Sequence, residues 1–128
     1  MKIGAPKEIF AGENRVAMTP DSALQLQKLG HECFVETGAG AGAGISDAAY
    51  AAAGVTVVKT AAALFKEADV VAKVRPPSEA EAKKLRQGQT LISFFYPAQN
   101  KDLLDACNKQ GATVIAMDMV PRISRAQK

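Results

Sequence analysis

The sequence predicts an α/β domain with a doubly wound, mainly parallel sheet, and three observations carry this prediction. Short apolar runs alternate with helical segments along all 128 residues, as expected where each strand is followed by a crossover helix. Most of these runs are continuously apolar, which is typical of strands covered on both faces. The connections between them are short. We therefore expect one three-layer sandwich over residues 1–128, of the Rossmann-like or flavodoxin-like kind.

Six apolar runs rich in β-branched residues are the predicted strands. They cover residues 2–5, 32–36, 55–58, 70–74, 90–95 and 113–117. In doubly wound sheets, ligands bind beyond the carboxyl ends of the strands. The segments expected at that edge are residues 6–18, 38–45, 75–78, 96–99 and 118–122.

The segments between the strands carry start and stop signals for helices. Thr19 is a predicted N-cap, Pro20 takes the first helical position and Gly30 ends that helix. Ser78 and Glu81 form a capping-box pattern that begins a later helix. The other predicted helices cover residues 47–53 after Ser46, 61–68 after Thr60, and 101–110 after Asn100.

The last residues of the sequence predict the start of one more helix. Ser124 and Gln127 have capping-box spacing. A single turn does not sustain a helix, because nucleation costs more than one hydrogen bond returns. We therefore expect this chain to be a fragment of a longer protein.

Composition disfavours several classes of function. The formal net charge is only +3, and there are two Tyr, five Phe and no Trp, so neither a basic patch nor a base-stacking surface for nucleic acid is expected. His31 is the single histidine, which leaves little material for a metal site or a His-based triad. Cys33 and Cys107 lie among apolar neighbours and are predicted to be reduced core thiols. Without a signal core or an apolar membrane span, the chain is expected to be soluble and cytoplasmic.

A glycine-alanine run at residues 38–44 follows the second predicted strand. Its spacing fits the dinucleotide-binding form GxGxxA through Gly38, Gly40 and Ala43. However, the next strand ends at Lys59 without a carboxylate for a ribose, and the run lies in the second strand–helix unit. We interpret it as a turn that needs positive φ and close backbone packing, with a cofactor loop as the alternative.

Two pairs of polar residues near the ligand edge are candidate site residues. Arg15 and Lys73 could together clamp a small carboxylate, and the alternative is a surface ion pair between Arg15 and Glu13. Arg122 could hold a phosphate or amide oxygen, and Gln127 could bond a carboxamide. The residues alone favour the simpler interpretation for the second pair, in which Gln127 caps a helix and Arg122 is solvated.

The motifs resemble a known family along the entire chain. GAPKE at residues 4–8, ENRVAMTP at 13–20 and VETGAG at 35–40 look like the opening shared by alanine dehydrogenases and the α subunits of transhydrogenases. YPAQN at 96–100 and MDMVPRISRAQ at 117–127 look like the transhydrogenase version. Alanine dehydrogenases keep a substrate-binding histidine near the position of Tyr96, which this chain lacks. It retains Arg15 and Lys73, which match that family's substrate-carboxylate residues.

The resemblance implies a role in proton-translocating nicotinamide nucleotide transhydrogenase, an oxidoreductase that moves a hydride from NADH to NADP⁺. This chain would be the N-terminal lobe of the NAD(H)-binding component, and a Rossmann lobe would follow Lys128. By resemblance, Arg122 and Gln127 belong to a loop that orients the nicotinamide of bound NAD(H), so both are catalytic and cofactor-binding candidates. NADP(H) would bind to a partner component, and no metal is implied.

The resemblance also implies partners and a location. The full protein would be a homodimer that works with NADP-binding and membrane-spanning components, and it would be cytoplasmic and peripheral to the inner membrane. Two alternatives stay open. One is an alanine-dehydrogenase-like enzyme that uses NAD, and the other is a non-catalytic module that senses nucleotides.

Overall fold

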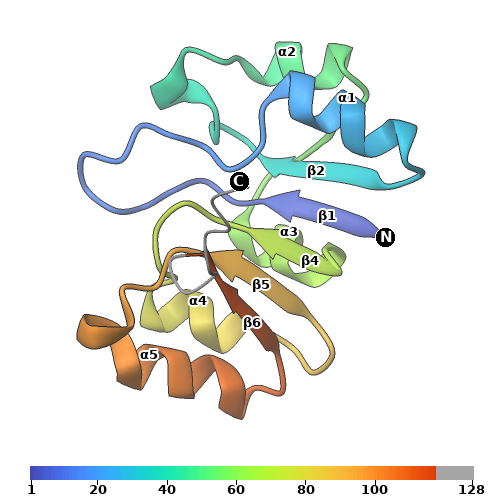
Figure 1. The fold of residues 1–128 in the computed structure, drawn as a ribbon. Coiled ribbons are helices and arrows are strands. Elements are labelled where there is room, and N and C mark those ends of the chain that lie inside the picture. The colour runs from blue at the N-terminus through green and yellow to red at the C-terminus, as the bar shows by residue number, and fades with distance from the viewer. Residues whose placement is uncertain (118–128) are drawn as a thin grey trace, which may run out of the picture.

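The computed structural model describes residues 1–117, apart from the side chains of residues 97–99, and shows one six-stranded sheet. All neighbouring strands pair in parallel, in the order β3-β2-β1-β4-β5-β6 (Figure 1). This is the Rossmann order and not the flavodoxin order. The strands are β1 (Lys2–Ala5), β2 (Glu32–Glu36), β3 (Thr56–Val58), β4 (Val70–Ala72), β5 (Thr90–Ser93) and β6 (Thr113–Ala116).

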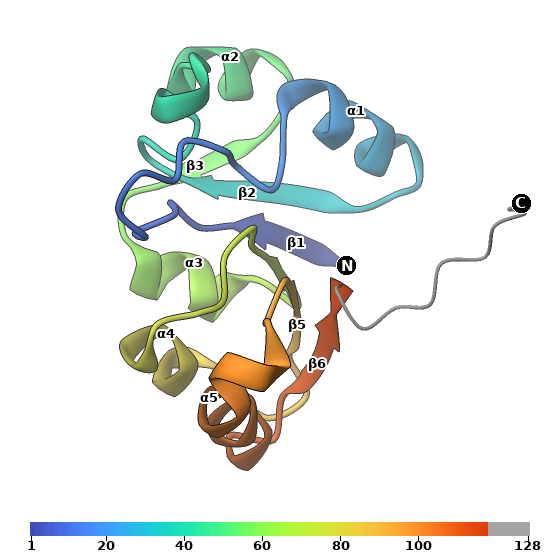
Figure 2. The same cartoon turned by 60° about the vertical axis from the view of Figure 1, so that its left-hand side comes forward.

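Helices form a layer on each face of the sheet (Figure 2). On one face, α1 (Pro20–Lys28) packs on β2 and α2 (Asp47–Ala52) packs on β3. On the other face, α3 (Ala61–Glu67) packs on the first three strands, and α4 (Glu79–Lys84) packs beside α5 (Pro97–Lys109), which covers β6. The two layers follow from right-handed crossovers, because the chain adds strands in opposite directions from β1 and from β4.

Each helical layer encloses its own apolar core. The core under α1 and α2 includes Met18 and Tyr50, and the Tyr50 hydroxyl donates to the Met18 carbonyl at 2.6 Å. The core under α3, α4 and α5 includes Phe65 and Phe95, both fully buried. Cys33 and Cys107, one in each core, are buried free thiols, which confirms the prediction made for them.

Four of the predicted helix starts are confirmed. Thr19, Ser46, Thr60 and Ser78 all accept a hydrogen bond from a backbone N–H of the first turn. The capping box of Ser78 and Glu81 is complete. A short 3₁₀ turn over Ala41–Ala43 lies within the glycine-alanine run and was not predicted.

Two kinds of predicted boundary are wrong. Strands β4, β5 and β6 are one or two residues shorter than predicted, because the chain turns into loops at the carboxyl edge sooner than the apolar runs end, and β3 begins one residue later than predicted. The last described helix begins at Pro97 and not after Asn100, where the backbone is instead kinked (φ −128°, ψ 31°). Proline is favoured in the first turn of a helix, which explains the earlier start.

Candidate functional site

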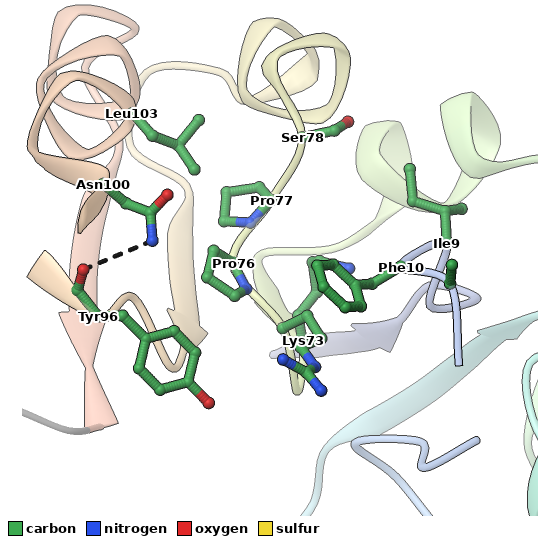
Figure 3. A pocket seen from close by; sticks show the side chains of 11 residues that line it. Ile9, Phe10, Lys73, Pro76, Pro77, Ser78, Tyr96, Asn100 and Leu103 are labelled. Carbon is green, nitrogen blue, oxygen red and sulfur yellow. Dashed lines mark hydrogen bonds between the residues drawn. The ribbon is translucent and has the colours of Figure 1, made fainter. Parts of the chain in front are cut away.

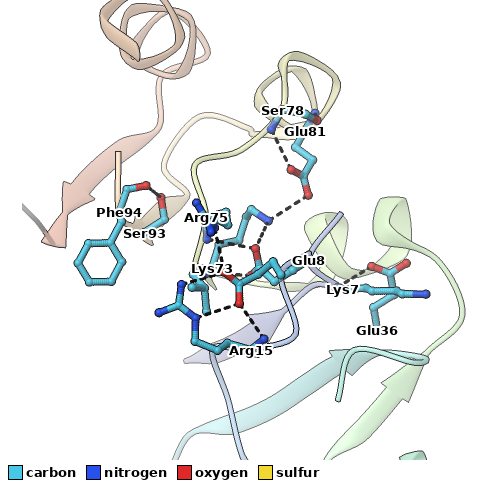
Figure 4. Close-up of polar contacts among 12 residues, drawn as sticks. Lys7, Glu8, Arg15, Glu36, Lys73, Arg75, Ser78, Glu81, Ser93 and Phe94 are labelled. Atoms are coloured by element: carbon cyan, nitrogen blue, oxygen red, sulfur yellow. Dashed lines mark hydrogen bonds and ion pairs between the residues drawn. The ribbon is translucent and has the colours of Figure 1, made fainter. Parts of the chain in front are cut away.

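The candidate site lies where the sheet changes direction, between β1 and β4. The loop after β1 and the loop after β4 leave the same edge of the sheet toward opposite helical layers. In this class of sheet, ligands bind in the crevice at such a switch point. Six charged side chains from these two loops and α4 gather there (Figure 4). We call them the switch-point cluster: Glu8, Glu13, Arg15, Lys73, Arg75 and Glu81.

Glu8 joins the two loops. Its carboxylate accepts hydrogen bonds from Lys73 Nζ at 3.0 Å, from the Val74 amide at 2.9 Å and from the Arg75 amide at 3.1 Å. Its side chain is 1% exposed. Three donors therefore satisfy this buried carboxylate, as such a group requires.

Lys73 lies between two carboxylates. Besides Glu8, its ammonium contacts the Glu81 carboxylate at 3.4 Å, and the Lys73 side chain is also 1% exposed. Glu81 in turn accepts from the Ser78 amide within the capping box. The start of α4 is thus tied to the loop after β1 through one lysine.

The more exposed half of the cluster contains Glu13 between two arginines. Arg15 donates to Glu13 through Nε at 2.9 Å and through a terminal nitrogen at 2.8 Å, and Arg75 Nε donates to it at 2.8 Å. The hydrogen bonds from Arg15, followed by that from Arg75, hold the pKa of the Glu13 carboxyl well below its usual range. Glu13 also raises the pKa of Arg15, so both groups stay charged near neutral pH.

A pocket of about 780 Å³ opens beside the cluster (Figure 3). Lys73 and Arg75 contribute its cations, and the Arg75 guanidinium lies 4.3 Å from the centroid of the Phe10 ring. Tyr96 lines the far side. It has the left-handed φ of 50°, which is uncommon for a residue other than glycine. The other lining residues are Ile9, Ala11, Pro76, Pro77, Ser78, Asn100 and Leu103.

Largely apolar walls with a few polar groups suit a small molecule that has a flat or aliphatic part and an anionic or amide oxygen. The cations differ in how available they are to such a ligand. The Arg75 side chain is 30% exposed, whereas Lys73 is enclosed by Glu8 and Glu81. An anion that enters the pocket would therefore meet Arg75 more easily than Lys73.

The structure places both predicted carboxylate ligands, Arg15 and Lys73, at the switch point. It also contains the ion pair between Arg15 and Glu13 that was the alternative interpretation. Arg75 connects the two halves of the cluster, because its amide bonds Glu8 and its side chain bonds Glu13. The roles of Glu8 and Arg75 were missed. The only available signal was that a second cation follows Lys73 within the same loop.

The glycine-alanine run packs closely against its surroundings. A Cβ added at Gly40 would lie 2.8 Å from atoms of Ile45 and Tyr50, and one at Gly42 would lie 3.0 Å from the Asn14 backbone. The Gly38 amide donates to the Asp47 carboxylate at 3.0 Å. These contacts match the predicted turn, with positive φ at Gly38 and at Gly44. A phosphate would have to compete with Asp47 for the Gly38 amide.

Arg122 and Gln127 lie outside the described residues. Within residues 1–117, no group of three or more His, Cys, Asp or Glu side chains could hold a metal ion. No helix in this described part of the chain is long and apolar enough to cross a membrane.

The strand order and the charged crevice at the switch point define a Rossmann-type α/β domain with a candidate ligand site at its carboxyl edge. A family model described as the N-terminal domain of alanine dehydrogenase/PNT matches residues 4–128. The chain belongs to this family.

Known proteins of two kinds are similar to this chain. It is 74% identical over all of its 128 residues to the NAD(P) transhydrogenase subunit alpha of Cereibacter sphaeroides, of which it covers 24%. It is 41% identical over 94% of its length to the alanine dehydrogenase of Mycolicibacterium smegmatis, of which it covers 32%. A solved transhydrogenase from Sinorhizobium meliloti superimposes with a TM-score of 0.92 at 39% identity, over 99% of this chain and 38% of that one.

Proposed function

We propose that this chain is the N-terminal lobe of the NAD(H)-binding component of a proton-translocating nicotinamide nucleotide transhydrogenase. The observation that carries the proposal is the 74% identity over the whole chain to a transhydrogenase subunit alpha. The chain spans about a quarter to a third of the length of these relatives. The proposed activity, transfer of a hydride from NADH to NADP⁺, therefore belongs to a longer protein, whose Rossmann lobe would follow Lys128.

The proposed reaction makes limited chemical demands on this lobe. Direct hydride transfer between two nicotinamide rings needs near-attack geometry more than acid or base catalysis. The lobe would contribute its carboxyl edge to the cleft in which NAD(H) lies. Arg122 and Gln127, which follow β6 in the sequence, would orient the nicotinamide. NADP(H) would bind to a partner component, and a homodimer peripheral to the inner membrane would complete the assembly with membrane-spanning components.

An alanine-dehydrogenase-like activity is the second candidate. The alanine dehydrogenase relative and the position of Arg15 and Lys73 at the switch point favour it. Tyr96, near the position of that enzyme's substrate-binding histidine, argues against it. If the small carboxylate did bind here, Arg15 and Lys73 would be its ligands, after displacement of the carboxylates that now pair with them.

An absorbance assay on the full-length subunit, mixed with its NADP-binding partner, tests these alternatives. NADH would be offered with a spectrally distinct NADP⁺ analogue, and separately with pyruvate and ammonium. We expect reduction of the analogue only. Oxidation of NADH with pyruvate only would establish the dehydrogenase instead, and no turnover with either acceptor would indicate a non-catalytic nucleotide-sensing module.

The proposed role of Arg122 predicts a specific kinetic effect. In the reconstituted full-length enzyme, Arg122→Ala should slow hydride transfer more than it weakens NADH binding, because an orienting contact contributes to the near-attack geometry. Single-turnover rates and NADH titrations measure the two effects separately. An unchanged transfer rate would remove Arg122 from the site.

A further inference from the structure

Arg75 is the cation of the pocket beside the switch-point cluster that keeps donors for a ligand. Its guanidinium bonds Glu13 through Nε at 2.8 Å. Among the groups that the structure describes, the guanidinium makes no other hydrogen bond or ion pair, so the terminal nitrogens Nη1 and Nη2 can donate to a further acceptor. Lys73, the other cation that lines the pocket, already contacts two carboxylates. We therefore expect an anion in the pocket to bond Arg75.

The contacts of Arg75 hold its guanidinium in one position. The guanidinium lies over the Phe10 ring in a cation–π contact. Glu13, which bonds Nε, is itself bonded twice by the Arg15 side chain and is 3% exposed. The Arg75 amide donates to the buried Glu8 carboxylate. A side chain that is fixed before binding loses less conformational entropy on binding, so Arg75 is preorganised to bind an anion.

Aromatic and proline rings form walls of this pocket. Phe10 and Tyr96 lie on opposite sides of Pro76 (Figure 3). The Tyr96 ring stacks on the Phe94 ring, with centroids 6.3 Å apart and an interplanar angle of 16°. The left-handed backbone of Tyr96 is a strained conformation, of the kind that clusters at ligand sites. Such walls suit the flat apolar body of an aromatic molecule.

We propose that this pocket binds a small aromatic carboxylate. Nη1 and Nη2 of Arg75 donate to its two carboxylate oxygens, in the fork geometry that a guanidinium group favours. The aromatic ring of the ligand packs against Tyr96 and Pro76. The pocket volume of about 780 Å³ lies within the range of small-molecule sites.

The proposed site differs from the carboxylate clamp of Arg15 and Lys73 considered above. Lys73 keeps its contacts with Glu8 and Glu81. Arg15 keeps its contact with Glu13, so no ion pair has to break when the ligand binds. The ligand binds without a chemical step. Binding at Arg75 is therefore separate from both candidate activities.

Isothermal titration calorimetry on the full-length subunit without nucleotide tests this proposal. Indole-3-acetate is the probe, indole-3-acetamide has the same ring without the charge, and acetate has the charge without the ring. We expect both controls to bind at least about tenfold more weakly than indole-3-acetate, because each lacks one of the two interactions. Equal affinity of either control, or no binding of indole-3-acetate at about 10 mM, would overturn the proposal.

Variants of the same subunit locate the carboxylate. Arg75→Gln should weaken binding of indole-3-acetate at least about tenfold, because charge-assisted hydrogen bonds are lost. Arg75→Lys keeps the charge without the fork and should weaken binding about threefold or more. Arg86→Gln is the matched control, since Arg86 is a 45% exposed arginine after α4, and it should leave the affinity unchanged. Arg15→Gln should change the affinity less than about twofold, because Arg15 does not bond the ligand.

Thermal unfolding of each variant verifies its fold, and Arg75→Lys decides the question if Arg75→Gln does not fold. Wild-type affinity in either folded Arg75 variant would overturn the proposal. A loss in Arg15→Gln or Arg86→Gln as large as that in Arg75→Gln would overturn it as well, because the carboxylate would then bind the clamp or no defined site. The readout is binding of the probe, so the outcome does not depend on whether the subunit transfers hydride.

Discussion

Glu8 is the residue on which the geometry of the switch point depends most. Its buried carboxylate accepts three hydrogen bonds from the loop after β4, one of them from Lys73. Without Glu8, the buried Lys73 ammonium keeps only the longer contact to Glu81, and the Val74 and Arg75 amides lose their acceptor. Loss of partners is costly for buried polar and charged groups.

We therefore expect Glu8→Ala to lower the free energy of unfolding by about 3 to 5 kcal/mol. Urea denaturation of this chain measures the change. Glu67→Ala is the control, because Glu67 forms an exposed ion pair with Lys2 at 3.6 Å and should contribute less than about 1 kcal/mol. A loss at Glu8 no larger than at Glu67 would show that the buried contacts do not hold the loops.

Glu13 makes stability depend on pH. Its pKa in the folded chain is lowered from the ordinary value of 4.5, first by Arg15 and then by Arg75. A lowered pKa contributes stability that is present above the unfolded value and lost as the pH falls toward the folded one.

The difference in stability between the wild-type chain and Glu13→Gln should thus be largest near pH 7 and shrink as the pH falls below about 4.5. Thermal unfolding of both proteins at a series of pH values tests this. A difference that is constant over the series would mean that the charge of Glu13 is not what stabilises the loop.

At the scale of single residues, the sequence predicts the cations of the switch-point cluster better than the carboxylates that pair with them. Arg15 and Lys73 were found because each lies at or beyond the end of a predicted strand. Glu8 pairs with Lys73 across 65 positions, and no local pattern specifies that contact. Burial of Glu8 results from the approach of two loops, which depends on the whole sheet.

At the scale of elements, the glycine-alanine turn shows that glycine is needed where the backbone packs too closely against its neighbours to leave room for a Cβ. The turn packs onto α2 through Gly40 and onto the loop after β1 through Gly42. Its glycines therefore allow close packing within the fold, although their spacing also fits the sequence pattern of a cofactor-binding loop.

Gly40→Ala should destabilise the chain by about 1 to 3 kcal/mol, because the new Cβ would lie 2.8 Å from both Ile45 and the Tyr50 ring. The midpoint of urea unfolding reports the loss. Ala41→Ser is the control in the same turn, since Ala41 is exposed. If the two variants were equally stable, the neighbours of Gly40 would have to give way easily.

Element types were predictable, whereas several boundaries were not. Caps such as Thr19 and Ser78 act through their nearest neighbours in sequence, so their patterns specify helix starts directly. Strands end where tertiary contacts bend the chain. Lys73 lies within the predicted strand of residues 70–74 but beyond the end of β4, and its side chain bonds Glu8. The start of the last described helix was missed because Asn100 is a favourable cap residue, whereas the helix begins at Pro97, which favours the first turn.

For the whole molecule, the number of strands and the parallel arrangement followed from the alternation of apolar runs and helices. The strand order did not, because the Rossmann and flavodoxin orders use the same alternation. The position of β1 next to β4 decides where the crevice forms, and it depends on the crossover through α3.

The division into two cores has a consequence for synthesis on the ribosome. Every residue of the core under α1 and α2 lies between Ile3 and Val57, so this half can close while the rest of the chain is still being translated. The second core begins at Phe34 but needs Ala116 and waits for β6. A nascent chain that pauses between these points exposes β1 as an unpaired sheet edge, because its second neighbour, β4, is not yet in place. Nascent chains would therefore depend most on chaperones in that interval.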